Sequence, residues 1–244
     1  MTVLYEDNHL LIVSKAAGEI VQGDKTGDAT LADAARAYIK EKYHKPGEVF
    51  LGIPHRIDRP TSGIVVLCRT SKSLTRMSNL FRDGEVHKTY HAIVPRIDAA
   101  TASRLREAAK QSALQGTYLE DEKAGWHTLQ HYLTRNERQN KSYAHTHAVP
   151  QSKHALLQWR ETAQSDRYSL LEVRLLTGRH HQIRCQLAAI GLPIRGDLKY
   201  GAPRSNPDGS ICLHARSIDF VHPVSKKPIH IEAPYPALPL WHVF

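Results

Sequence analysis

The sequence predicts an α+β protein built on a large, mostly antiparallel mixed sheet flanked by helices. Helical and strand-like runs are mixed along the chain without the regular alternation that parallel sheets require. Strand-like runs then follow one another between residues 128 and 176 with short spacers, as in an antiparallel meander. The 244 residues, 41% of them hydrophobic, suffice to bury a large core. Because no repeat or linker divides the chain, we expect a single domain over residues 1–244.

The first elements are a strand and a helix. The run LLIVSK at residues 10–15 is rich in β-branched residues and ends in AAG, which predicts a strand that runs into a turn. In residues 29–44 the apolar residues recur at helical spacing, and Thr30 with Asp33 supplies a capping box. We therefore expect a helix over this range.

Two strands enclose the most unusual stretch of the chain. The runs at 48–53 and 63–69 are both expected to be strands, and the second is apolar at successive positions. Such a run is typical of a strand buried on both faces. The stretch HRIDRPTSG at 55–63 is then a loop held between two core strands.

The remaining elements follow from the same periodicities. Helices are expected over 71–84, 101–113 and 180–191. Strands are expected over 88–94, 128–135, 141–149, 154–162, 168–176, 213–221 and 228–233. The acidic stretch 115–127 is expected to be a loop.

The charge of the chain favours a polyanionic partner. Lys and Arg number 33 and Asp and Glu 24, so the formal net charge is +9. A field of this sign attracts RNA, DNA or an acidic membrane surface. The N-terminus carries acids where a signal peptide has bases, and no stretch approaches the ~20 apolar residues of a membrane span. We expect a soluble, cytoplasmic protein that binds no membrane.

Cysteine and histidine usage indicates no metal and no cofactor. Cys68, Cys185 and Cys212 lie far apart in apolar or helical runs, which predicts buried free thiols. His145 and His147 are a possible ligand pair on one strand face, but no HExxH or acidic partner at ligand spacing accompanies them. Most of the 16 histidines are therefore expected to face RNA or solvent. The motifs GxxxxGK[ST], GxGxxG and GxSxG are missing as well, which argues against nucleotide cofactors and serine hydrolysis.

Asp58 lies between Arg56 and Arg59, and two interpretations of it stay open. An Asp followed by Arg-Pro and Thr-Ser-Gly is ordinary turn chemistry. The alternative is a functional carboxylate, because neighbouring positive charge keeps an acid ionised even when it is partly desolvated. An ionised acid repels the polyanion that a basic groove attracts, so its presence there favours a role in acting on the bound ligand.

A second cluster is TGRHHQIR at 177–184. Arg179, His180 and His181 crowd the expected helix start, where they add to the positive end of the helix dipole and favour an anion. Arg184 falls at the edge of the apolar helix face, so it either points into a cleft or is an ordinary snorkelling arginine.

Tyr90 lies on the expected strand 88–94, between Lys88 and His91. An aromatic ring in such surroundings stacks on an unstacked base, or it is a core tyrosine.

These stretches resemble the RluA family of pseudouridine synthases. HRIDRPTSG is similar to the family's HRLDxxTSG signature, KTYHAIV to its KxYxA segment, and TGRHHQIR with GLPIRGDLKYG to its last block. LYEDNHLLIVSKAAG and LHARSIDFVHP resemble the flanking motifs, so the resemblance covers nearly the whole chain apart from a variable region at 98–150. It begins at residue 3, so we expect a stand-alone catalytic domain without the S4 RNA-binding module of many relatives. The chain departs from the family pattern in KAAG for KPAG, and in Gln186 where relatives often have His.

The resemblance implies a role for each matched residue around a central catalytic cleft. Asp58 is the catalytic aspartate, and Arg184 forms a salt bridge with it. Tyr90 packs against the target base, and Arg56 fills the space left by the flipped-out uridine. Six residues in or beside the motifs are expected to contact RNA: Lys15, His55, Arg59, Lys88, Arg179 and His181.

The implied activity is isomerisation of uridine to pseudouridine in tRNA or 23S-type large-subunit rRNA, by a monomer that needs no metal or other cofactor. Base flipping exposes the glycosidic bond, and a carboxylate beside C1′ stabilises or traps an oxocarbenium-like centre. Attack on the uracil ring and proton abstraction from the sugar are competing mechanisms. A non-catalytic RNA-binding or ribosome-assembly factor on the same scaffold is the alternative function, and a metal-dependent nucleic-acid hydrolase is a third.

Overall fold

A computed structural model describes residues 1–23, 27–113, 118–121 and 125–244. Its contacts divide the chain into two compact units. The first comprises Met1–Lys88 and His214–Ala237, and the second comprises Thr89–Leu213 and Leu238–Phe244. The single domain expected from the sequence stays a prediction.

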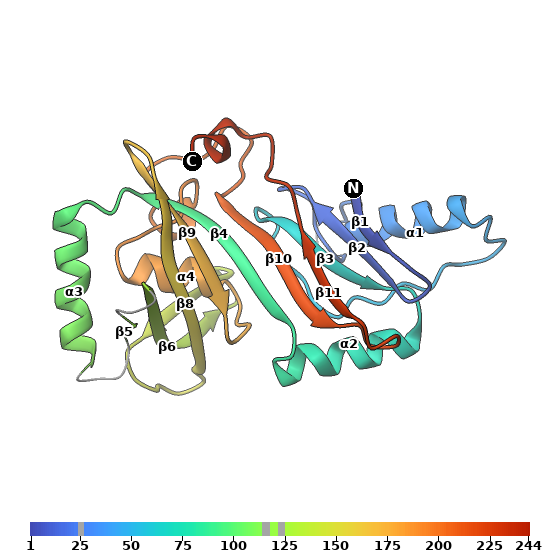
Figure 1. Cartoon of the computed structure of the whole chain (residues 1–244), viewed down its shortest axis with the longest axis horizontal. Helices are drawn as coiled ribbons and strands as arrows, with labels where there is room; N and C mark the ends of the chain where they lie inside the picture. Colours follow the sequence, from blue (N-terminus) through green and yellow to red (C-terminus); the bar gives the residue numbers. More distant parts are fainter. Residues whose placement is uncertain (24–26, 114–117, 122–124) are drawn as a thin grey trace. The chain divides into compact units, whose positions relative to one another are not determined.

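The first unit is a sheet with two helices (Figure 1). Its strands are β1 (Thr2–Glu6), β2 (Leu10–Lys15), β3 (Ser62–Cys68), β10 (Leu213–Val221) and β11 (Pro228–Glu232). They lie in the order β1-β2-β3-β10-β11, in which β3 and β10 are parallel and the other neighbours antiparallel. The helices are α1 (Leu31–Lys42) and α2 (Ser71–Asp83).

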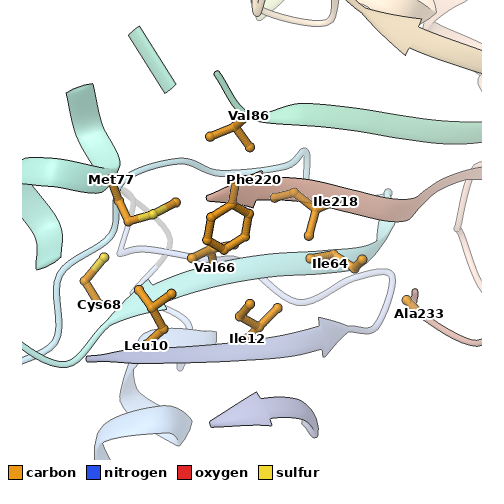
Figure 2. Packing of buried hydrophobic residues seen from close by; sticks show 10 residues of the cluster. All are labelled: Leu10, Ile12, Ile64, Val66, Cys68, Met77, Val86, Ile218, Phe220 and Ala233. Atoms are coloured by element: carbon orange, nitrogen blue, oxygen red, sulfur yellow. The ribbon is translucent and has the colours of Figure 1, made fainter. Parts of the chain in front are cut away.

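Apolar side chains of the sheet and of α2 form the core of this unit. Figure 2 shows Phe220 of β10 among residues of β2, β3 and α2. The buried cluster consists of Leu10, Ile12, Ile64, Val66, Cys68, Met77, Val86, Ile218, Phe220 and Ala233. Every residue of β3 is buried, so the prediction of a strand covered on both faces is confirmed.

The two helices of this unit begin and end where their local chemistry dictates. Thr30 and Asp33 form the predicted capping box, and α1 starts at the next residue, Leu31. The Thr70 hydroxyl accepts the Ser73 N–H at 3.1 Å at the start of α2. Gly84, with φ 79°, ends α2 in the left-handed conformation that favours glycine.

The second unit is an antiparallel meander with two helices. Its strands are β4 (His87–Pro95), β5 (Tyr118–Asp121), β6 (Trp126–Asn136), β7 (Lys141–His145), β8 (Lys153–Gln164) and β9 (Tyr168–Leu175). They lie in the order β4-β9-β8-β6, with β5 and β7 both paired to β6. The helices are α3 (Ala99–Ala113) and α4 (Gln182–Ala189), and short 3-10 turns cover Leu198–Tyr200 and Pro239–His242.

Buried polar bonds fix α4 on one face of this meander. The Gln186 amide donates to the carbonyl oxygens of Leu129 at 3.1 Å and Ala155 at 3.3 Å. It also lies 3.0 Å from His131 Nδ1. The Gln that stands where relatives often have His is therefore a buried residue whose amide nitrogen is held by three polar partners.

The predicted α+β class with a mostly antiparallel mixed sheet is confirmed by these elements. The strands expected over 10–15 and 213–221 match β2 and β10 residue for residue. The expected helix over 101–113 begins two residues earlier, at Ala99. The expected central cleft concerns both units and stays a prediction. No helix in the described part of the chain combines the length and apolarity needed to cross a bilayer.

Two sequence expectations are wrong. Residues 48–53 do not form a strand. Of these residues, Gly52 alone pairs with β3, through two backbone hydrogen bonds to Cys68, and the N–H of Val66 in β3 is accepted by the His55 side chain instead of by a strand carbonyl. The expected loop 115–127 contains strand β5 and the start of β6. Residues 114–117 and 122–124 of that range lie outside the described residues.

Gly63 allows β3 and β10 to approach closely. Its φ is 113°, and a Cβ at this position would lie 2.3 Å from the carbonyl oxygen of Ala215. The two residues are partners in the parallel register of β3 and β10. A side chain here would push apart the strands that follow the HRIDRPTSG loop.

We expect Gly63→Ala to lower the free energy of unfolding by about 2–4 kcal/mol, through steric overlap added to left-handed strain. Gly84→Ala is the matched control, because Gly84 has φ 79° with nothing within 4 Å of the added Cβ. Strain alone should cost it about 1 kcal/mol. Urea unfolding measures both, and equal losses would contradict the close-approach argument.

Candidate active site

The start of the HRIDRPTSG loop is fastened to β3 by His55. Its Nε2 accepts the backbone N–H of Val66 at 2.9 Å, and its ring stacks on Phe81 at 4.4 Å. Burial lowers the pKa of His55 to about 3, and the charge of Lys88 adds to this effect. A neutral imidazole that accepts a backbone N–H has a structural role, and the expected RNA contact of His55 stays a prediction.

The end of the loop is fastened by a turn and by a buried polar pair. The Thr61 N–H donates to the Asp58 carbonyl at 3.0 Å. Thr61 and Ser62 are buried, and Ser62 Oγ lies 2.8 Å from His214 Nδ1. The backbone on both sides of Asp58 is therefore tied to the sheet of the first unit.

The buried side chain of Lys15 bonds the loop to the turn after β2. It is 1% exposed, and its ammonium donates to the carbonyl oxygens of Ala16, Glu19 and Arg59 at 2.9, 2.8 and 3.1 Å. Burial lowers its pKa to about 8, while the charges of Glu19 and Asp58 act in the opposite direction. All three ammonium donors of Lys15 are engaged by carbonyl oxygens, and its expected RNA contact stays a prediction.

Arg59 ties the loop to the turn after β2. Its Nε donates to the Gly18 carbonyl at 3.0 Å, and its carbonyl accepts the Gly18 N–H at 2.8 Å. Its guanidinium also pairs with Asp28 at 3.0 Å, with both side chains about half exposed. The turn at KAAG is thus well braced without the proline usual in relatives.

This scaffold presents Asp58 and Arg56 on a rigid backbone. Asp58 is partly exposed and Arg56 is exposed. The Asp58 carboxylate lies close enough to Lys15 to raise the pKa of that ammonium. The carboxylate of Asp58 thus lies in a loop whose backbone is fixed, with a buried ammonium nearby.

In the second unit, Arg184 forms a buried ion pair with Asp197. Its Nε and Nη2 donate to the two carboxylate oxygens at 2.6 and 2.9 Å, and the side chains are 6% and 1% exposed. The Tyr200 ring lies 5.1 Å from the guanidinium carbon. The sequence analysis did not identify Asp197 as the ion-pair partner of Arg184, although Asp197 lies in the GLPIRGDLKYG motif. The expected salt bridge between Arg184 and Asp58 joins residues of different units and stays a prediction.

Gln182 organises the TGRHH turn. Its side-chain oxygen accepts from the Thr177 hydroxyl and the Arg179 N–H, both at 2.9 Å, and its amide donates to the Leu156 carbonyl at 3.0 Å. The exposed Arg179 donates from Nε to the His154 carbonyl at 2.8 Å. Helix α4 consequently begins at Gln182, two residues later than expected.

His181 is a buried, neutral residue of this turn. It has φ 51° and is 8% exposed, and its Nδ1 lies 3.0 Å from the Tyr200 hydroxyl. Burial lowers its pKa to about 2, and the charge of Arg184 adds to this. The expected RNA contact of His181 stays a prediction.

Lys88 and Tyr90 lie on β4. Burial lowers the pKa of Lys88, whose ammonium lies 5.6 Å from the centre of the Phe81 ring. Tyr90 is 8% exposed and pairs with Val173 of β9. Its stacking on a base stays a prediction.

The remaining histidines differ in their exposure, and the three cysteines are buried. His131, His214 and His222 are at most 7% exposed and do not face solvent, whereas most of the other histidines are partly or fully exposed. The three cysteines are buried and free as predicted, and burial raises their pKa values to about 11 or 12. Within the residues that the structure describes, no three side chains group as metal ligands.

We expect Lys15→Met to remove a pH dependence of stability. Because the pKa of Lys15 falls from 10.5 to about 8 on folding, the unfolded chain binds one more proton between these values. The free energy of unfolding of the wild type should then rise, relative to the variant, by about 2 kcal/mol from pH 8 to 10. Lys40→Met, at an exposed position, is the control and should leave the dependence intact. Parallel curves for wild type and Lys15→Met would refute the assignment.

We expect Asp197→Asn to cost about 3–5 kcal/mol of unfolding free energy, because it leaves the Arg184 charge buried without its carboxylate. Glu172→Gln is the control. Its partner Arg160, at 2.6 Å, has a side chain that is 40% exposed, so less than about 1 kcal/mol should be lost. Chemical denaturation of both variants makes the comparison, and similar small losses would show that the buried pair contributes little.

Comparison with known proteins agrees with these motifs. The family described as RNA pseudouridylate synthase matches residues 9–189. Ribosomal large subunit pseudouridine synthase D of Xanthomonas campestris pv. campestris is 31% identical over 97% of this chain and 66% of its own length. The tRNA pseudouridine synthase C of Pectobacterium carotovorum subsp. carotovorum is 28% identical over 97% of this chain and 60% of its own length. The chain thus spans somewhat less than two thirds of these curated relatives.

Solved structures agree in fold. Human RNA Pseudouridylate Synthase Domain Containing 4 aligns with a TM-score of 0.70 at 19% identity, over 97% of this chain and 89% of that one. Human RNA Pseudouridylate Synthase Domain Containing 1 aligns with a TM-score of 0.66 at 21% identity, over 98% and 85%. Because the family match covers most of the chain, from the second strand to the end of α4, this protein belongs to the RNA pseudouridylate synthase family.

Proposed function

We propose that this protein is an RNA pseudouridine synthase in which Asp58 is the catalytic carboxylate. The observation that carries the proposal is the loop of Asp58, which Lys15, His55 and Arg59 fasten to the sheet while Asp58 itself stays partly exposed. Precise placement of one ionised acid is what a reaction at a single bond requires. Family membership supplies the reaction class.

The proposed reaction rearranges bonds within one nucleotide. The C1′–N1 bond of a flipped-out uridine breaks, the uracil turns, and a C1′–C5 bond forms. N1 gains a proton and C5 loses one, so the product is an isomer. An ionised carboxylate beside C1′ stabilises or traps the electron-deficient sugar carbon, as in a retaining glycosidase. Attack of Asp58 on the ring, or abstraction of a sugar proton, is the competing role.

Other matched residues are proposed to position the substrate. Arg56 enters the space left by the uridine, and its exposure on the rigid loop supports this. Tyr90 packs against the base, and Arg184 balances the charge of Asp58. The exposed guanidinium of Arg179 is proposed to contact phosphate.

The proposed substrate is tRNA or large-subunit rRNA, because relatives are named for each of them. The net charge of +9 supports an RNA partner. We further propose that the protein acts as a monomer in the cytoplasm, away from membranes. Pseudouridine mapping of total RNA from cells with and without the gene identifies the RNA, and sedimentation of the purified protein tests the monomer.

We expect Asp58→Asn to keep RNA affinity within about threefold while pseudouridine formation is lost, because the amide keeps the shape but removes the charge and the nucleophile. Single-turnover assays on the mapped RNA measure product, and equilibrium binding to the same RNA measures affinity. Asp28→Asn, which alters the exposed partner of Arg59, is the control and should stay active.

Near-wild-type turnover by Asp58→Asn would overturn the catalytic assignment. If the wild type binds RNA but mapping and assays find no pseudouridine, the protein is instead the non-catalytic RNA-binding factor. Metal-dependent cleavage of the RNA would identify the third alternative, the hydrolase.

A further inference from the structure

The hairpin between β6 and β7 carries a row of basic side chains. Arg135, Arg138 and Lys141 recur every third residue, and Glu137 is the acid among them. Both arginines are exposed, and Lys141 is partly exposed. Lys199, from the 3-10 turn after α4, adds a fourth cation beside the hairpin.

Polar bonds fasten the tip of this hairpin to the segment after α4. Lys199 Nζ donates to the carbonyl oxygens of Gln139 at 3.3 Å and Asn140 at 3.1 Å. The N–H of Ser142 donates to the Tyr200 hydroxyl at 2.8 Å. The exposed Lys199 ammonium makes two of these bonds and the buried Tyr200 hydroxyl makes the third, and together they hold the hairpin tip in place within the second unit.

The hairpin is also joined to the TGRHH turn. The Ser142 hydroxyl donates to the His180 carbonyl at 2.8 Å, and His180 Nε2 lies 3.1 Å from the Asn140 side-chain oxygen. The charges of Arg135 and Lys199 contribute to the lowered pKa of His181, which places both cations around this turn. The basic row therefore lies beside the TGRHH turn, which also carries the exposed Arg179.

An aromatic ring accompanies the cations. Tyr143 of β7 is 40% exposed, and the Lys141 ammonium lies 5.6 Å from its ring centre. Four cations, one acid and one exposed ring form a surface that is charged rather than apolar. Such a surface suits a sugar–phosphate backbone, whose charges are regularly spaced, better than the apolar core of a protein interface.

Tyr200 connects this surface to the buried pair of α4. Its hydroxyl bonds both Ser142 and His181, and its ring lies against the Arg184 guanidinium. Asp197, the partner of Arg184, begins the same 3-10 turn. A ligand held by the hairpin is thereby held at a fixed position relative to Arg184.

We propose that the β6–β7 hairpin, with Arg135, Arg138, Lys141 and Lys199, binds the phosphate backbone of the substrate RNA next to the target uridine. This rests on the proposed function, and it assigns a role to part of the variable region 98–150. The contact is electrostatic, so it contributes affinity and positioning without reading the base sequence.

The test is a double substitution, Arg135→Ala with Arg138→Ala, in an Asp58→Asn background that prevents turnover. Binding to deproteinised tRNA and large-subunit rRNA is measured across salt concentrations. We expect about 10- to 100-fold weaker binding, and a slope of log affinity against log salt that is shallower by about two, one for each lost phosphate contact.

The control is Arg96→Ala with Arg167→Ala, which removes the same charge from the same unit. Both are exposed, Arg96 N–H bonds the Arg167 carbonyl at 3.0 Å, and this turn follows the end of β8 far from the hairpin. We expect a change of less than about threefold and an unchanged slope. Equal effects of the two pairs, or no effect of either, overturn the proposal.

A turnover assay distinguishes failure of the hairpin contact from failure of the proposed function. With Asp58 intact, the hairpin double variant should need more RNA for half-maximal rate while the rate at saturation changes little. If the wild type forms no pseudouridine but the hairpin pair still weakens RNA binding, the proposed function fails and the RNA contact stands. Loss of activity with unchanged affinity and salt slope would show a structural role of the hairpin and overturn the contact.

Discussion

The close approach of β3 and β10 at Gly63 and Ala215 is the constraint on which the first unit depends. It is the parallel pairing in a sheet whose other neighbours are antiparallel, and it brings together strands distant in sequence. The Ser62–His214 pair lies beside it, so a polar bond locks the same crossing. Because Gly63 is the last residue of the HRIDRPTSG stretch, the backbone of the catalytic candidate is set by strand packing as well as by the loop.

The two units bury a cation in different ways. Lys15 is buried and bonded to carbonyl oxygens without a carboxylate among them, and burial lowers its pKa. Arg184 instead forms a bidentate ion pair with the carboxylate of Asp197, so a full negative charge lies beside its guanidinium. The lysine braces a backbone turn, whereas the arginine is fixed as a charged group in its own right. Within the second unit, the Tyr200 ring lies against this fixed charge, and the Tyr200 hydroxyl bonds the hairpin and the turn that carry the exposed cations.

Elements governed by local pattern could be predicted from the sequence, and long-range pairings could not. The capping box of Thr30 and Asp33 is a local device, and α1 starts where it indicates. The strand predicted over 48–53 is wrong because an apolar run does not reveal which group bonds to β3. There the His55 side chain, and not the backbone of a neighbouring strand, accepts the N–H of Val66. Motifs likewise located Asp58 and Arg184, but the burial of His55, Lys15 and His181 depends on neighbours that composition does not specify.

Each unit contains at least one buried thiol whose reactivity can report local unfolding of that unit. Cys68 lies in the core of the first unit, while Cys185 and Cys212 lie in the second. A buried thiol with a raised pKa reacts quickly with an alkylating reagent only when its surroundings open. Labelling rates followed by peptide mass would therefore resolve the opening of one unit from that of the other in the unmodified chain, without an introduced probe.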